Sequence, residues 1–213
     1  MSASTQNQAL SAILFLYEVV LGERLGWMND IVRAQRPVRL PVVLSRGEVS
    51  ALLAQLHGTM WLMASLMYGS GLRPLECVEL RVKDVHLDRG ELMVRDAKGG
   101  KDRSTMLPAA LKGPLSRHLE RRKAQHDSDV AAGRGSVALP GALAAKYPNA
   151  GRELAWQWVF PATRFYVDDA TSERRRHHVH ESVLQRAVRE AVRAVGIPRP
   201  ATCHTLRLCH ASA

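Results

Sequence analysis

A run of 24 residues without a charged side chain, from Val49 to Leu72, restricts the folds open to this chain. A membrane span needs about 20 consecutive apolar residues to cross roughly 30 Å of hydrocarbon. Four residues interrupt the run and leave apolar stretches too short for that, namely Gln55, His57, Gly58 and Thr59. We therefore expect two buried helices of a globular domain here, and no membrane association.

Helical spacing of apolar residues marks most of the remaining chain. Ser45 and Glu48 have the spacing of a capping box, which predicts that a helix starts at this point. In the helix predicted at residues 180–195, we expect Val183 to face inward, opposite a stripe of exposed arginines. The same period, bounded by glycine or proline, predicts further helices at residues 1–22, 61–68, 74–80, 109–126 and 180–195.

The period changes to that of strands between the third and fourth of these helices. Three alternating segments predict a small antiparallel sheet, at residues 82–87, 91–95 and 103–107. The turn at 98–101 is rich in glycine and lysine, and residues 127–155 are irregular, with room for one short helix around 140–146. The whole pattern predicts a mainly helical α+β fold.

The charge of the chain indicates its class of partner. Thirty lysines and arginines against twenty acidic residues give a formal net charge of +10, which favours a polyanion. Residues 95–123 hold nine basic and three acidic side chains, and residues 171–213 hold eight and three. Two basic segments on a near-neutral remainder are typical of a clamp for a phosphate backbone, although solvated helix faces have the same composition.

The cysteines and the N-terminus point to the cytoplasm. Cys77, Cys203 and Cys209 are an odd number without metal-type spacing, which argues against a disulfide scaffold or a zinc site. The polar N-terminus lacks the basic region of a signal peptide. We expect Cys77 to be a buried packing residue.

Three short motifs carry side chains suited to phosphate chemistry. Arg73 follows a glycine break at a helix start, where it can meet an anion, and Glu76 one turn later can orient it. A lysine on the turn at 98–101 can donate a proton to a leaving oxygen. His204 and Arg207 share one face of a helix. Taken alone, each motif is better explained as an ordinary ion pair or a solvated side chain.

In their order, the three motifs resemble those of the tyrosine recombinase (phage integrase) family. They read Leu-x-Tyr-Gly-x-Gly-Leu-Arg-x-x-Glu at 66–76, Lys-Gly-Gly-Lys-Asp-Arg at 98–103 and Ala-Thr-x-His-Thr-Leu-Arg at 201–207. The segment VALPGALAAKYPNAG, residues 137–151, resembles an insertion particular to integron integrases. The resemblance covers nearly the whole chain and implies a tyrosine recombinase catalytic domain. It also implies site-specific DNA recombination without a metal or nucleotide cofactor.

The resemblance further implies roles for single residues and for partners. Arg73 and Arg207 match the arginines that grip the scissile phosphate in its pentavalent transition state. Lys98 matches the lysine that protonates the leaving 5′ oxygen, with Lys101 as second choice. His204 matches the histidine that hydrogen-bonds the phosphate and assists proton transfer. The implied partners are DNA recombination sites, folded single strands among them, and further copies of the chain on DNA.

Other residues are expected to support the site or to contact DNA. Glu76 matches an acidic position that supports the catalytic arginine. Phosphates are the expected partners of Lys101, Arg103, Arg175, Arg176, His177 and His178. A metal site is the alternative for the last residues of this set, but no cysteine or carboxylate cluster accompanies them. Trp156 and Trp158 fit either a stacking platform for an extruded base or core contacts of a strand.

The chain departs from the family at both ends. The family's nucleophilic tyrosine follows the His-x-x-Arg motif, whereas this sequence ends six residues after Arg207 and its last tyrosine is Tyr166. We expect a frameshift or premature stop, with a truncated catalytic domain in residues 40–213. Residues 1–33 then correspond to the last helix of a core-binding (SAM-like) DNA-clamp domain and its linker. The alternatives are a DNA-binding remnant without catalysis, a product that never folds stably, and an RNA-binding protein.

Overall fold

Two compact units, residues 1–40 and 41–213, make up the chain. In the first unit, helix α1 (Ala3–Phe15) begins at Ser2, whose hydroxyl accepts a hydrogen bond from the backbone N–H of Thr5. A π-helical turn, Leu16–Val20, extends it, so the helix predicted at this end is confirmed. The computed structural model describes residues 2–23, 26, 34–35, 42–97, 100–169 and 171–210. Residues 24–25 and 27–33, in the part of the chain where the linker is predicted, lie outside them.

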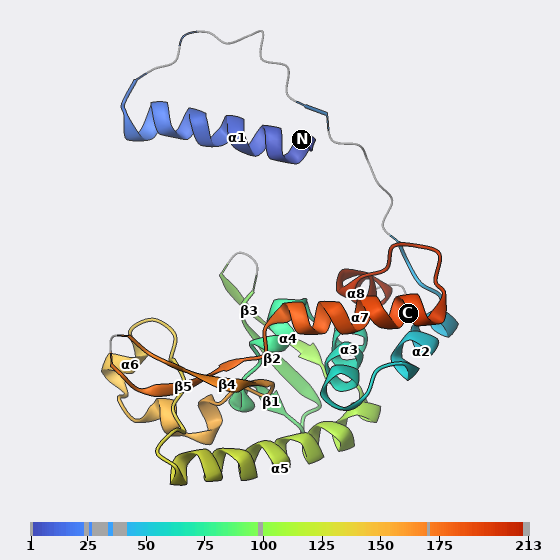
Figure 1. The fold of residues 1–213 in the computed structure, drawn as a ribbon, viewed down its shortest axis with the longest axis vertical. Helices are drawn as coiled ribbons and strands as arrows, with labels where there is room; N and C mark the ends of the chain where they lie inside the picture. Colours follow the sequence, from blue (N-terminus) through green and yellow to red (C-terminus); the bar gives the residue numbers. More distant parts are fainter. Residues whose placement is uncertain are drawn as a thin grey trace. The chain divides into compact units, whose positions relative to one another are not determined.

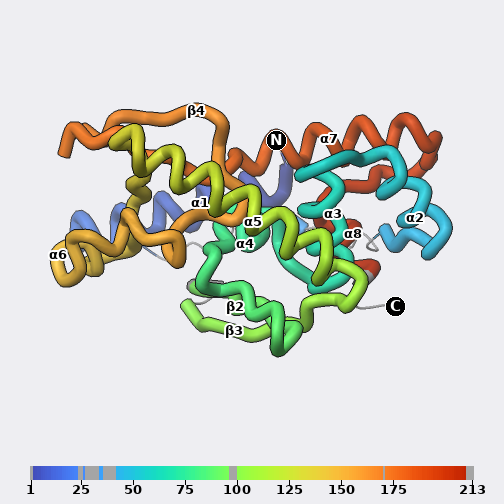
Figure 2. Tube along the Cα trace, turned by 90° about the horizontal axis from the view of Figure 1, so that it is seen from below, coloured from blue at the N-terminus to red at the C-terminus, as the bar shows by residue number. Residues whose placement is uncertain are grey.

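Helices form most of the second unit. Figures 1 and 2 show α2, α3 and α8 gathered at one end of this unit and α6 at the other, with α5 running from one end toward the other. Short 3-10 turns cover Val82–Asp84, Ala150–Arg152 and Leu154–Trp156. The helices are α2 (Arg46–Ala54), α3 (Gly58–Ser70), α4 (Pro74–Val78), α5 (Ala109–Ala131), α6 (Leu143–Lys146), α7 (Glu181–Val195) and α8 (Cys203–His210).

Two antiparallel sheets complete the second unit. Strands β1 (Val85–His86), β2 (Glu91–Ala97) and β3 (Lys101–Met106) pair in that order. The prediction of a strand at 82–87 is wrong for its first half, because residues 82–84 form a 3-10 turn. A second hairpin, β4 (Pro161–Val167) and β5 (Arg174–His178), is not among the elements predicted from the sequence, and its second strand is a run of basic residues.

The core of the second unit is built around α3. This helix is apolar on most faces and buries seven of its residues, which is why the run around it carries no charge. Leu206 of α8 and Phe160 pack fully buried in the same core, and Cys77 is buried as predicted. Val183 of α7 is 44% exposed, contrary to prediction, because the buried face of that helix begins at Leu184.

The fold class predicted from the sequence, mainly helical α+β with a small antiparallel sheet, is confirmed. The capping box at the start of α2 is also formed, since Ser45 and Glu48 each accept a hydrogen bond from the backbone N–H of the other. Within the described ranges, no helix combines the length and the apolar character that a bilayer crossing needs.

Candidate active site

The turn between α3 and α4 places Arg73 at the start of a helix. Gly71 ends α3 in the left-handed conformation, with φ of 64°, which other residues adopt only at a cost. Pro74 follows at the first position of α4, where no N–H is needed. The Glu76 carboxylate accepts hydrogen bonds from the backbone N–H of Arg73 at 2.7 Å and from its Nη1 at 2.6 Å. Glu76 therefore fixes both the backbone and the side chain of this arginine.

Glu76 also binds the first hairpin. Arg103, in β3, donates from Nη2 to Oε2 of Glu76 at 2.7 Å. Two residues along, the Thr105 hydroxyl donates to the Ser70 carbonyl at 2.7 Å. Only 8% of the Glu76 side chain is exposed, so its carboxylate lies between two guanidinium groups with little access to water.

Helix α8 adds a third guanidinium group. Arg207 donates from Nε to the Gly71 carbonyl at 3.0 Å, two residues before Arg73. Partial burial lowers the pKa of Arg207, and the like charges of Arg73 and Arg103 lower it further, against the opposing charge of Glu76. We call these four residues, Arg73, Glu76, Arg103 and Arg207, the arginine cluster. Three positive charges around one carboxylate leave an excess of positive charge, which suits a phosphate group.

His204 lies one helical turn before Arg207 and is exposed. Residues three apart share a helix face, so the imidazole lies on the same side of α8 as the guanidinium group. An imidazole in this position can donate a hydrogen bond to a phosphate oxygen.

Of the two candidate lysines, Lys98 lies outside the described residues. Lys101 begins β3, is exposed, and pairs with Ala97 at the end of β2. Because Arg103 and Thr105 attach β3 to the loop between α3 and α4, the strand that begins at Lys101 is fixed to the arginine cluster.

Arg176 is not available for DNA, contrary to prediction. Its side chain is 6% exposed, and Nε and Nη2 donate to the Asp129 carboxylate on α5 at 3.1 and 2.7 Å. Nη1 donates to the carbonyls of Ala162 and Thr163, and the guanidinium carbon lies 3.9 Å from the ring centroid of Phe165. These contacts explain why a run of charged residues forms a strand, since the buried charge has its partners inside the protein.

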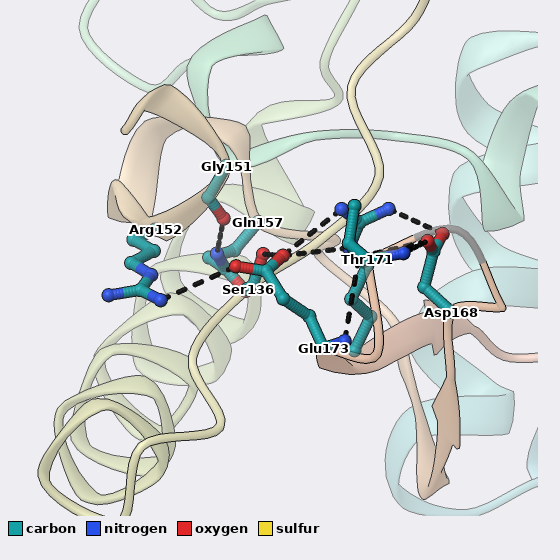
Figure 3. Close-up of polar contacts among 8 residues, drawn as sticks. Ser136, Gly151, Arg152, Gln157, Asp168, Thr171 and Glu173 are labelled. Atoms are coloured by element: carbon teal, nitrogen blue, oxygen red, sulfur yellow. Dashed lines mark hydrogen bonds and ion pairs between the residues drawn. The ribbon is translucent and has the colours of Figure 1, made fainter. Parts of the chain in front are cut away.

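Arg175 also binds within the protein. Its guanidinium group donates to Asp168 at 2.6 Å and to Glu173 at 3.0 and 3.1 Å. Figure 3 shows that the Glu173 carboxylate also accepts from Ser136 and Arg152. These hydrogen bonds connect the turn between β4 and β5 to Ser136 and Arg152, in the segment between α5 and β4. With 16% of its side chain exposed and its charge neutralised, Arg175 is not retained as a DNA contact.

The rings of His177 and His178 lie close together, with centroids 4.0 Å apart and planes tilted by 55°. His177 is exposed, while burial lowers the pKa of His178, whose ring meets Trp158 edge-on at 5.1 Å. Among the described residues, no group of three or more His, Cys, Asp or Glu side chains could hold a metal ion. The two histidines and Trp158 form an aromatic group.

A cleft of about 250 Å³ separates this aromatic group from the arginine cluster. Its lining includes Glu76, Arg81, Lys83, Trp156 and Trp158. Trp158 is 8% exposed and packs as a core residue, whereas Trp156 is partly exposed. Both tryptophans line the cleft, and of the two only Trp156 keeps a partly exposed side chain.

The arrangement of Glu76 predicts an acid-sensitive contribution to stability. Burial alone would raise the pKa of Glu76, but hydrogen bonds from Arg73 and the charge of Arg103 outweigh it and hold the pKa below the ordinary value of 4.5. A carboxyl group with a lowered folded-state pKa stabilises the fold above its unfolded pKa and loses this effect as the pH falls through the folded value.

Thermal unfolding of the wild-type chain and of Glu76→Gln, followed from neutral pH into acid, measures this contribution. The stability advantage of the wild type should be constant near neutral pH and should shrink below about pH 4.5. An advantage that stays the same down to about pH 3 would contradict an ionised, arginine-bound Glu76.

Comparison with known proteins assigns the family. The model of the phage integrase family matches residues 43–213. Two relatives named integrase/recombinase, from Escherichia coli and Pseudomonas aeruginosa, are each 46% identical over 212 residues and match the whole of this chain. The chain spans 63% of the length of each of them. It belongs to the phage integrase family of tyrosine recombinases.

Among solved structures, the post-cleavage complex of the XerH site-specific recombinase with a palindromic difH substrate is similar in fold. The TM-score is 0.61 over the whole of this chain and 56% of that protein, at 16% identity. At this identity the likeness concerns the fold, and it agrees with the mainly helical α+β architecture described above.

Proposed function

We propose that this chain provides the phosphate-binding part of a site-specific DNA recombinase that acts by phosphotransfer through a tyrosine. The observation that carries the proposal is the arginine cluster, in which Arg73 and Arg103 donate to the Glu76 carboxylate and Arg207 donates to the nearby Gly71 carbonyl. Positioned cations stabilise the charge that develops on phosphoryl oxygens during phosphotransfer. In this reaction Arg73 and Arg207 bind the scissile phosphate, and His204 donates a hydrogen bond to it.

The family resemblance supports the remaining roles. The tyrosine hydroxyl attacks the phosphorus and passes its proton to His204, so that a 3′-phosphotyrosyl bond forms while the bond from phosphorus to the 5′ oxygen breaks, and Lys98 gives the leaving oxygen its proton. A second candidate function is DNA binding without strand cleavage, which the net charge of +10 and the positive excess of the arginine cluster support.

Binding and cleavage assays separate the two functions. We expect DNA affinity to fall steeply with salt, because bound phosphates release their counterions. A polypeptide of these 213 residues is expected to bind a nicked suicide substrate without forming a denaturation-resistant adduct. An adduct would favour complete recombinase chemistry, and an affinity that does not change with salt would contradict both functions.

We further propose that the recombinase is of the integron type and that the cleft receives a base extruded from folded single-stranded DNA. The partly exposed ring of Trp156 at the cleft supports this role, because base–aromatic stacking is tolerant of sequence. The ammonium group of Lys83 lies over one face of the Trp156 ring, 3.3 Å from its centroid, which leaves the other face for a base. Glu76 of the arginine cluster also lines the cleft, so a base bound in the cleft lies near the arginine cluster.

A DNA hairpin with one unpaired base tests the cleft. The wild-type chain should bind it at least about fivefold more tightly than the fully paired hairpin, because one stacked base contributes about 1–3 kcal/mol. Trp156→Ala should remove this difference and leave the affinity for paired DNA unchanged. Equal affinity of the wild type for both hairpins would contradict a base-binding cleft.

A further inference from the structure

Arg81 makes an unusual set of contacts close to the cleft. It lies three residues after α4 and is 9% exposed. Nη1 donates to the Trp156 carbonyl at 2.6 Å, and Nη2 donates to the Ala138 carbonyl at 3.0 Å. One guanidinium group therefore joins both ends of the segment 138–156 to the chain that leaves α4.

The same guanidinium group stacks on the wall of the cleft. Its central carbon lies 3.8 Å from the ring centroid of Trp158 and 5.7 Å from that of Trp156. The backbone holds this geometry, because Arg81 pairs with Trp158 in an antiparallel bridge. Neighbouring hydrogen bonds run from the N–H of Val82 to Gln157 and from that of Val159 to Leu80.

The charge on Arg81 is retained despite its burial. Burial lowers the pKa of Arg81 to about 10, against the opposing charges of Asp84 and Glu79, so the group is cationic at neutral pH. Burying a cation costs free energy unless the cation is hydrogen-bonded. The carbonyl groups that accept from Arg81 belong to Trp156 and to Ala138. Arg81 is thus placed to fix the tryptophans rather than to bind solvent.

One polar atom in the wall of the cleft remains without a partner. Nε1 of Trp158 is buried and has no hydrogen-bond acceptor among the described residues. Arg81, stacked on the same ring, holds this buried indole in place.

We propose that Arg81 is a positioning residue for the base-binding cleft, holding the rings of Trp156 and Trp158 so that an extruded base can stack beside them. The inference rests on the proposed function of the cleft. Lysine cannot replace arginine here, because it can neither bond to two carbonyls in one plane nor stack as a flat cation. Arg81 also connects the cleft to α4, which carries Glu76 of the arginine cluster.

The test is the ratio of affinities for the hairpin with one unpaired base and for the fully paired hairpin, measured on Arg81→Lys. We expect this ratio to fall at least about threefold below the wild-type value, because the stacking platform is no longer held in place. Both affinities come from the same preparation, so an inactive or unfolded fraction cancels in the ratio. Arg121→Lys, an exposed arginine on α5, is the matched control and should keep the wild-type ratio.

A double-mutant cycle with Trp158→Phe shows whether Arg81 acts through the ring. If Arg81 acts through the ring, the double variant lowers the affinity ratio by a smaller factor than the product of the factors measured for the two single variants. Independent, multiplicative effects would overturn the proposal, as would an unchanged ratio in Arg81→Lys when the wild type prefers the unpaired base. A wild type without that preference would overturn the base-binding cleft and, with it, the role of Arg81.

Discussion

Replacing Asp129 with alanine should destabilise the chain by about 3–5 kcal/mol, the cost of leaving a buried charge without its partner. Asp129 accepts three hydrogen bonds from Arg176, and both side chains are almost fully buried. Arg122 adds to the effect. Burial lowers its pKa to about 10, the charge of Arg176 lowers it further, and Asp129 opposes both. Without Asp129, two buried arginines repel each other.

Denaturant unfolding followed by circular dichroism measures the loss. The matched control is the double variant Asp129→Leu with Arg176→Met, which removes both charges and should be close to neutral in stability. The double variant should also bind DNA as tightly as the wild type, because Arg176 is enclosed by the protein. A loss below about 1 kcal/mol for Asp129→Ala, or weaker DNA binding by the folded double variant, would contradict the structural role of Arg176.

The predictions from sequence were reliable where a local signal decides the structure. The capping box at Ser45 and the apolar period of α7 depend on residues within one or two turns, and both elements were found where predicted. The β4–β5 hairpin was missed because its second strand is a run of arginines and histidines. What stabilises that strand is Asp129, almost fifty residues earlier in the chain, and no local pattern reveals such a partner.

The candidate site was predictable in its residue types but not in its connections. The sequence suggested that Glu76 could orient Arg73, and the structure has that contact. It did not reveal that Arg103 shares the same carboxylate, since the two lie 27 residues apart and meet only when the hairpin folds against α4. Nor did it reveal Arg81, whose partners are backbone carbonyls and therefore leave no mark on the sequence.

Replacing Arg207 with alanine should weaken DNA binding by roughly 10- to 150-fold, since a hydrogen bond to a charged group contributes about 1.5–3 kcal/mol. The slope of the logarithm of affinity against the logarithm of salt concentration should fall by about one, the signature of one lost phosphate contact. Titration of labelled DNA at several salt concentrations gives both values. Arg89→Ala, at an exposed position in the turn before β2 that lies outside both basic segments and the arginine cluster, is the control and should change neither strongly.

Arg73 and Arg207 should also act as a unit rather than as two independent contacts. Gly71 connects them, because its carbonyl accepts from Arg207 while its left-handed turn sets the start of the helix that carries Arg73. Removing either guanidinium group relieves the repulsion on the other and displaces the phosphate that both bind. The double variant, with alanine at Arg73 and Arg207, should therefore lose less DNA-binding free energy than the sum of the losses of the two single variants. Strictly additive losses would mean that the two arginines bind different phosphates, which would contradict a single phosphate site in the arginine cluster.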